Sequence, residues 1–67
     1  MPYINIKLTP ETLSAEKKRL VIREVTAVLE RHLNKNPATT IVVIDEVDTD
    51  NWGIAGESVT HRRGRLG

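Results

Sequence analysis

Pro2 is the residue with the clearest chemical potential, because it directly follows the initiator methionine. Proline is small enough that removal of Met1 is expected, and this cleavage leaves a free secondary amine at the start of the chain. Apolar surroundings and nearby cations disfavour the charged form of an amine and lower its pKa toward neutrality. An uncharged amine can accept a proton at neutral pH. Pro2 is therefore a candidate general base.

A second group of candidate residues lies late in the chain. Trp52 is followed by Gly53, so its ring can wall a small apolar pocket to which a ligand approaches closely, or it can anchor its loop to the core. Arg62, Arg63 and Arg65 form a basic cluster. Such a cluster can bind an anion, although taken by itself it is more typical of a solubilising tail.

Metal chemistry lacks the residues that it needs. The chain has no cysteine, which excludes disulfides and thiolate metal sites. His32 and His61 are far apart in the sequence and have no third imidazole to complete a zinc site. The acidic segment Asp48-x-Asp50 places Val59 where a calcium loop requires a bidentate carboxylate. The sequence therefore predicts no metal site.

Three regular elements are expected to position these groups. Residues 3–8 alternate between apolar and polar side chains, which predicts a half-buried strand. Apolar residues recur at helical spacing over 15–33, with Ser14 as the N-cap and Pro37 as the stop signal. Residues 39–44 are β-branched throughout and predict a strand covered on both faces.

A strand, a helix and a strand in this order predict a right-handed parallel crossover in a single domain of 67 residues. One such unit leaves a sheet face and both sheet edges uncovered. A chain of this size buries only about 60% of its extended surface, so we expect it to self-associate. After the second strand we expect a loop, a small hairpin over 52–57 and an arm that ends in a basic tail, residues 62–67.

Charge and hydropathy narrow the range of partners. Ten Lys and Arg residues against nine Asp and Glu residues give a net charge of +1, which offers no strong field for DNA or RNA. A small DNA-binding dimer, suggested by the size and the arginine tail, is disfavoured for that reason and because such proteins use two helices where this chain has one long helix. No apolar run approaches the roughly 20 residues of a membrane span, so we expect a soluble cytoplasmic protein with no membrane partner.

Several short motifs occur together and in order. They are the Met-Pro2 start, the helical segment Val21-Ile22-Arg23-Glu24-Val25 and the late segment Trp52-Gly53-Ile54-Ala55-Gly56-Glu57. In a β-α-β layout of this length, they resemble the 4-oxalocrotonate tautomerase family. The resemblance implies an α+β fold in which two β-α-β units join into a four-stranded sheet with two helices, plus a C-terminal hairpin. It also implies a homohexamer built as a trimer of dimers.

The resemblance further implies an isomerase that needs no cofactor and no metal. Its substrate would be a small unsaturated 2-hydroxy or 2-keto acid similar to 2-hydroxymuconate, and Pro2 would be the general base. Trp52 falls at the family's aromatic pocket position. Ile54 falls where a backbone N–H meets the substrate.

The chain departs from the family at two arginine positions. Those positions are occupied by Thr12 or Leu13 and by Ile41, none of which carries a positive charge. The developing enolate oxygen still needs a cation or a hydrogen-bond donor, since such stabilisation usually supplies much of the rate. The candidates for this role are Lys7, Arg62 and Arg63.

The missing arginines leave several alternatives open. A monocarboxylate or a neutral enol is a better candidate substrate than a dicarboxylate. A second hypothesis is a hydratase or dehalogenase reaction of the same superfamily. The third hypothesis is a non-enzymatic oligomerising module that keeps the scaffold and binds a partner through its loops.

Overall fold

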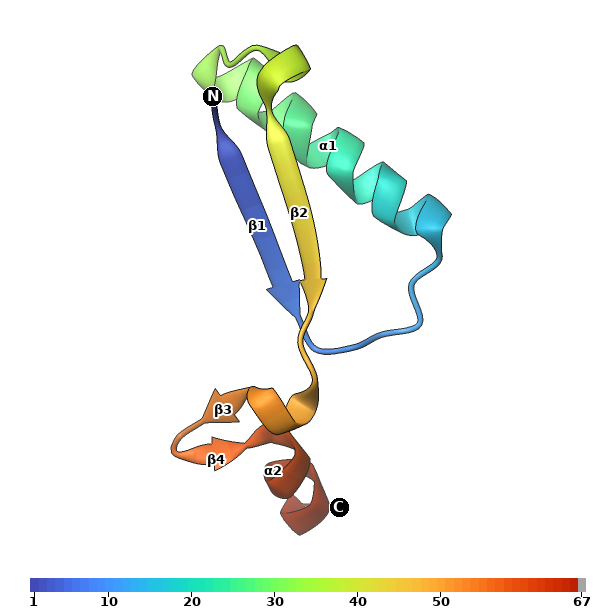
Figure 1. Ribbon diagram of the computed structural model, residues 1–67, viewed down its shortest axis with the longest axis vertical. Helices are drawn as coiled ribbons and strands as arrows, with labels where there is room; N and C mark the ends of the chain where they lie inside the picture. The colour runs from blue at the N-terminus through green and yellow to red at the C-terminus, as the bar shows by residue number, and fades with distance from the viewer. Residues whose placement is uncertain (67) are drawn as a thin grey trace.

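The computed structural model describes residues 1–66 and consists of a β-α-β unit followed by a small C-terminal lobe (Figure 1). The predicted strand, helix and strand are all present, and the predicted order of these elements is confirmed. Gly67, the last residue of the predicted basic tail, lies outside the described residues. The elements are β1 (Tyr3–Leu8), α1 (Ala15–Leu33), η1 (Pro37–Thr39), β2 (Ile41–Glu46), η2 (Thr49–Asn51), β3 (Gly53–Ile54), β4 (Glu57–Ser58) and α2 (Val59–Leu66).

The strands β1 and β2 pair in parallel, as the connection through a helix requires. Their register runs from Tyr3 opposite Ile41 to Leu8 opposite Glu46. Backbone hydrogen bonds continue the pairing at both ends, from Ile41 N to the Pro2 carbonyl oxygen at 3.0 Å and from Val47 N to the Leu8 carbonyl oxygen at 2.8 Å. Pro2 is thus held against the start of β2.

The helix α1 begins and ends where its capping residues predict. The Ser14 hydroxyl accepts a hydrogen bond from the Lys17 backbone N–H at 3.1 Å. Asn34 adopts the left-handed conformation, with φ 54° and ψ 39°, and closes the C-terminus. An ion pair of 3.0 Å between Lys18 Nζ and Glu46 Oε1 then joins the first turn of α1 to the end of β2.

The second strand begins later than predicted, at Ile41 rather than at Thr39. The preceding residues form the short 3₁₀-helix η1, in which Pro37 occupies the first turn and the Asn36 side chain accepts from the Ala38 backbone N–H at 2.9 Å. This local cap outweighs the β propensity of Thr39. The strand also extends past the predicted end at Ile44 to Glu46, so Asp45 belongs to the sheet and not to the loop expected after it.

The predicted basic arm is wrong as a description of residues 59–66, which form the helix α2. The Ser58 hydroxyl accepts a hydrogen bond from the His61 backbone N–H at 3.1 Å, as an N-cap residue does. Val59 is only 5% exposed, so the helix also packs against its own chain. A cap and one buried side chain therefore organise a segment in which three of the eight residues are arginine.

The chain as a whole is elongated and has little interior. Its radius of gyration is 15.5 Å, whereas a compact domain of this length has a radius of about 11 Å. Large apolar residues on α1 stay exposed, among them Val28 and Leu33, and Val59 is the one buried residue among those whose burial is described. Neither described helix has the length and apolar character needed to cross a membrane.

Candidate active site

A pocket of about 510 Å³ opens where the end of β1 meets the C-terminal lobe. It is lined by the end of β1, the hairpin and the start of α2, through Lys7, Leu8, Thr9, Trp52, Ile54, Val59, Arg62 and Arg63. A hollow of this size lies within the range of small-molecule sites. Five of the six residues predicted to bind or transform a substrate meet here; the sixth, Pro2, does not.

The aromatic wall of the pocket is held in place by the backbone of α2. The Val59 N–H donates a hydrogen bond to the Trp52 carbonyl oxygen at 2.7 Å, and Val59 itself is buried. Ala55 and Gly56 both have positive φ, 54° and 84°, which is the geometry of a two-residue hairpin turn between β3 and β4. The turn returns the chain beside Trp52 and Ile54, so a short hairpin shapes one side of the pocket.

The arginines of α2 fall into two classes. Arg65 forms an ion pair with Glu57 in β4, with Nη2 3.2 Å from Oε1 and Nε 3.3 Å from Oε2. Within the described residues, no carboxylate pairs with Arg62 or Arg63. Arg62 is half-buried and Arg63 is exposed. Two guanidinium groups in the pocket lining are therefore available to an anionic ligand.

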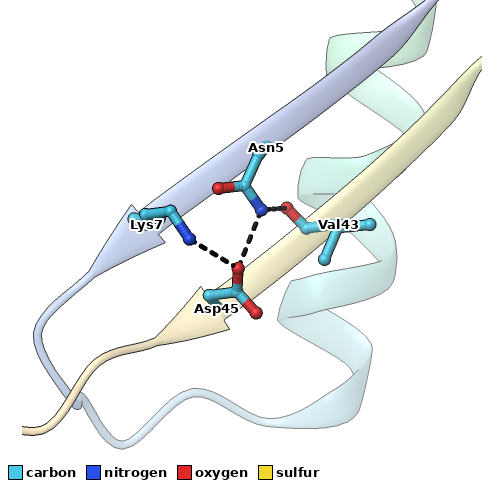
Figure 2. Close-up of polar contacts among 4 residues, drawn as sticks. All are labelled: Asn5, Lys7, Val43 and Asp45. Atoms are coloured by element: carbon cyan, nitrogen blue, oxygen red, sulfur yellow. Dashed lines mark hydrogen bonds and ion pairs between the residues drawn. The ribbon is translucent and has the colours of Figure 1, made fainter.

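Lys7 lies at the strand end of the pocket and is already paired. Its Nζ is 3.0 Å from Asp45 Oδ2, and the Asn5 side-chain amide donates to the same oxygen at 2.9 Å (Figure 2). The hydrogen bond from Asn5, reinforced by the hydrogen bond and the charge of Lys7, lowers the pKa of Asp45 below its ordinary value of 3.8. Asp45 is thus ionised at neutral pH and offsets the charge of Lys7.

Pro2 directly precedes β1, whose start carries the N-terminus (Figure 1), whereas the pocket is lined by Lys7 and Leu8 at the other end of that strand. Five residue steps separate Pro2 from Lys7, which is about 16 Å at the rise of a β-strand. Pro2 is half-buried against Ile41, whereas Met1 is 88% exposed and therefore accessible to an aminopeptidase. In one chain the predicted base and the predicted substrate-binding residues form two separate sites.

The positions where the family carries arginines also lie apart. Ile41 is the first residue of β2 and bonds to Pro2, while Thr12 and Leu13 lie in the connection between β1 and α1. Thr12 is exposed and Leu13 is half-buried. None of the three lines the pocket. At one of these positions, Pro2 therefore has Ile41 as its neighbour, and Ile41 carries no charge.

A larger hollow, of about 910 Å³, follows the first turns of α1. All of its lining residues lie between Ser14 and Arg23, so one helix and its cap form it. No second element brings convergent polar groups to it. We therefore assign the candidate site to the smaller pocket, where three elements meet. No group of three or more His, Asp or Glu side chains that could hold a metal ion occurs among residues 1–66.

Asp45, which pairs with the pocket residue Lys7, and Asn5, which bonds to Asp45, were not identified as site residues from the sequence. Their signal lies in the register of the parallel sheet, which places Lys7 opposite Asp45 and Asn5 opposite Val43. The alternation along β1 puts Asn5 and Lys7 on one face, so a correct register would have predicted that both can reach Asp45.

The whole of this architecture matches known proteins. The family model described as Tautomerase enzyme matches residues 2–62. Probable tautomerase K2 of Dickeya dadantii is 59% identical over 63 residues, which is 94% of either chain. Among solved structures, DmpI from Helicobacter pylori has a TM-score of 0.84 at 48% identity, over 94% of this chain and 97% of that one.

A further solved structure is relevant to assembly. It is a heterohexamer 4-oxalocrotonate tautomerase from Chloroflexus aurantiacus, with a TM-score of 0.75 at 25% identity, over 90% of this chain and 95% of that one. The match of the family model over most of the chain, together with the high identity of whole-length relatives, confirms the predicted fold class. The chain belongs to the tautomerase family and is an isomerase.

Proposed function

We propose that this protein is a cofactor-independent keto–enol tautomerase of a small unsaturated 2-hydroxy or 2-keto acid. Pro2 is the general base in this proposal, and the pocket at Trp52 binds the substrate. The observation that carries it is the convergence of Lys7, Trp52, Ile54, Arg62 and Arg63 around one hollow. An aromatic wall beside guanidinium groups that pair with no carboxylate in residues 1–66 suits a flat conjugated acid.

In this proposal the active site forms between copies, because the base and the pocket lie apart within one chain. A general base acts within about 3 Å of the proton that it moves, whereas Pro2 lies about 16 Å along β1 from Lys7. The base of one copy must therefore meet the pocket of another. The exposed apolar flanks of α1 and the two-stranded sheet supply surfaces for such an assembly.

We further propose that two copies join their sheets into one four-stranded sheet, and that three such dimers form a hexamer. The elongated shape supports this arrangement, because the accessible surface of 5127 Å² exceeds the roughly 4,200 Å² of a compact monomer of the same mass. A related 4-oxalocrotonate tautomerase is a hexamer. The assembly would cover the apolar residues that a single chain leaves exposed.

The reaction then needs one proton and no external reagent. The Pro2 nitrogen accepts the proton of the enol hydroxyl, and the electron pair of that O–H bond becomes the negative charge of a dienolate. Arg62 or Arg63 stabilises the charge on oxygen. Pro2 then returns the proton to carbon, which forms the C–H bond and the ketone. Removal of Met1 is required, because with Met1 attached the Pro2 nitrogen is an amide without a basic lone pair.

The test is a comparison of Pro2→Ala with Pro37→Ala, a proline in the exposed 3₁₀-helix η1. With phenylenolpyruvate as substrate, Pro2→Ala is expected to reduce kcat by about 10²- to 10⁴-fold, and Pro37→Ala to leave it unchanged. Mass spectrometry verifies the loss of Met1, and size-exclusion chromatography verifies the assembly. Unchanged turnover in Pro2→Ala refutes the role of Pro2, and a low-pH limb near neutrality in the pH–rate profile supports it.

A further inference from the structure

The cations in the pocket lining differ in what surrounds them. Lys7 contacts the carboxylate of Asp45 at 3.0 Å, whereas Arg62 and Arg63 pair with no carboxylate in the described residues. The pocket therefore has a positive end at α2 and a nearly neutral end at β1. This difference in charge between the two ends of the pocket does not depend on where the general base lies.

The neutral end is built by two strands. Asp45 lies in β2 directly opposite Lys7 in β1, and Asn5 lies two residues earlier on the same face as Lys7. The Asn5 amide donates to Asp45 Oδ2 at 2.9 Å and to the Val43 carbonyl oxygen at 3.4 Å (Figure 2). Asn5 thus holds the carboxylate of Asp45 in position against Lys7, and the pair is fixed to paired strands rather than to a loop.

We propose that Asp45 determines substrate specificity by neutralising Lys7, so that the pocket selects an acid with one carboxylate over an acid with two. The single carboxylate binds at Arg62 and Arg63, and the uncharged part of the substrate extends toward Lys7. A second carboxylate there meets a negative charge beside the positive one. Placing a charge of the same sign close to the charge of an unwanted ligand is a common way for a protein to discriminate against that ligand.

The inference rests on the proposed function for the reaction, but ligand binding tests it without turnover. Trp52 is the one tryptophan of the chain and lines the pocket, so its fluorescence reports occupancy. Hexanoate and adipate are matched probes, since both have six carbons and they differ by one carboxylate. The measured quantity is the ratio of their dissociation constants in the intact assembly.

Asp45→Asn keeps the shape of the side chain and removes its charge. We expect adipate to bind about fivefold or more tightly in this variant, while hexanoate changes less than about twofold. Adding Lys7→Met to Asp45→Asn is expected to remove the gain. Lys7→Met alone leaves Asp45 without its cation and is expected to weaken adipate relative to hexanoate, which provides a second test if Asp45→Asn does not fold.

Glu46→Gln is the matched control. Glu46 is the next residue of β2, it also forms an ion pair of 3.0 Å with a lysine, and that lysine is Lys18 in α1 rather than a residue of the pocket. The substitution makes the same change in net charge, and the ratio of adipate to hexanoate is expected to stay at its wild-type value.

Three results would overturn the proposal. They are an unchanged ratio in Asp45→Asn, an equal change in Glu46→Gln, and the absence of saturable binding of hexanoate to the wild-type assembly. Failure of the proposed function gives a different pattern. If Pro2 is not the base, Pro2→Ala retains turnover while the binding ratios still respond to Asp45.

Discussion

The β-α-β unit and the C-terminal lobe are stabilised in different ways. The first has six-residue strands, a 19-residue helix and a continuous parallel register, yet none of its residues is fully buried. The second has strands of two residues and an eight-residue helix, yet it contains the buried Val59. The β-α-β unit, called the frame from here on, leaves its apolar flanks exposed, where another surface can cover them. The smaller lobe folds around one side chain and forms most of the pocket.

This difference separates the two halves of the proposed active site. Pro2 belongs to the frame, where a backbone hydrogen bond from Ile41 fixes it beside β2. Trp52, Arg62 and Arg63 belong to the lobe. Changes in the lobe should therefore affect ligand binding and charge stabilisation without altering the frame, whereas changes in the frame away from Pro2 and from the Lys7 end of the pocket should affect stability.

After Pro2→Ala, the largest effect is expected from Arg62 and Arg63, which pair with no carboxylate in the described residues. Arg62→Met combined with Arg63→Met is expected to lower kcat/KM on an enol acid by about 100-fold, because the developing enolate loses its cationic partner. Steady-state kinetics measures the loss, and circular dichroism verifies that α1 and the strands persist. Of the single variants, Arg62→Met should have the larger effect, since Arg62 is the more buried of the two.

The matched control for this change removes two positive charges from the frame. Arg19 and Arg23 are exposed on α1, and replacing both by methionine makes the same change in net charge. We expect this control to retain kcat/KM within about twofold, because neither arginine lines the pocket and exposed charges are screened by salt. An equal loss in both double variants would show that net charge, not the pocket, governs the rate.

The single buried side chain of the lobe gives the next effect. Val59→Ala removes two methyl groups from a site that is 5% exposed, and we expect a loss of about 1.5 kcal/mol in the stability of the lobe. Loosening there frees Trp52, whose carbonyl oxygen is bonded to the Val59 N–H. Trp52 emission and hydrogen exchange of the α2 amides measure the change.

Val28→Ala is the comparison in the frame, at a valine that is 42% exposed. It should leave Trp52 emission unchanged. If Val28→Ala shifts that emission as much as Val59→Ala, the lobe and the frame are a single cooperative unit and the distinction between them fails.

Much of the frame could be predicted because its signals are local. The alternation in residues 3–8 and the caps Ser14 and Asn34 each act within a few residues, and they position β1 and α1 correctly. The helix α2 was missed because residues 59–66 contain Gly64 and three arginines, with little apolar periodicity. Its cap and the burial of Val59 become visible only when the chain is folded.

The candidate site likewise combines residues that could be predicted from the sequence with a contact that could not. Trp52, Ile54, Lys7, Arg62 and Arg63 were predicted from residue type and resemblance, and all of them line the pocket. The neutralisation of Lys7 was not predicted, because residues 38 positions apart in sequence make that contact. Asp45 also follows the apolar run that ends at Ile44, so it fell in the loop expected after the second strand.

A smaller effect is expected when a helix-capping serine is replaced by alanine, once in the frame and once in the lobe. Ser14 and Ser58 each accept one backbone hydrogen bond of 3.1 Å at a helix start. Replacing a capping serine by alanine costs about 1 kcal/mol. Thermal unfolding should show a destabilisation of that size in Ser14→Ala with KM unchanged, whereas Ser58→Ala should raise KM because α2 carries Arg62 and Arg63. A raised KM in Ser14→Ala but not in Ser58→Ala would contradict this prediction.

The smallest effect concerns the titration of Asp45 where the frame borders the lobe. Hydrogen bonds from Asn5 and Lys7 favour the ionised carboxylate, so its pKa lies below 3.8 in the folded protein. The folded chain then binds fewer protons than the unfolded chain as the pH approaches that value. The contribution to stability is present above pH 3.8 and is lost as the pH falls through the folded pKa.

Asn5→Ala removes the hydrogen bond that lowers this pKa most. The carboxyl carbon resonance of Asp45, followed by NMR through an acid titration, should therefore have a higher midpoint in Asn5→Ala than in the wild type. Asn51→Ala, a change at an exposed asparagine in η2, should leave the midpoint where it is. A midpoint that does not respond to Asn5→Ala would mean that Lys7 alone holds the carboxylate. In that case Asp45 would follow the lysine rather than fix it, and the neutral end of the pocket would move with any ligand that displaces Lys7.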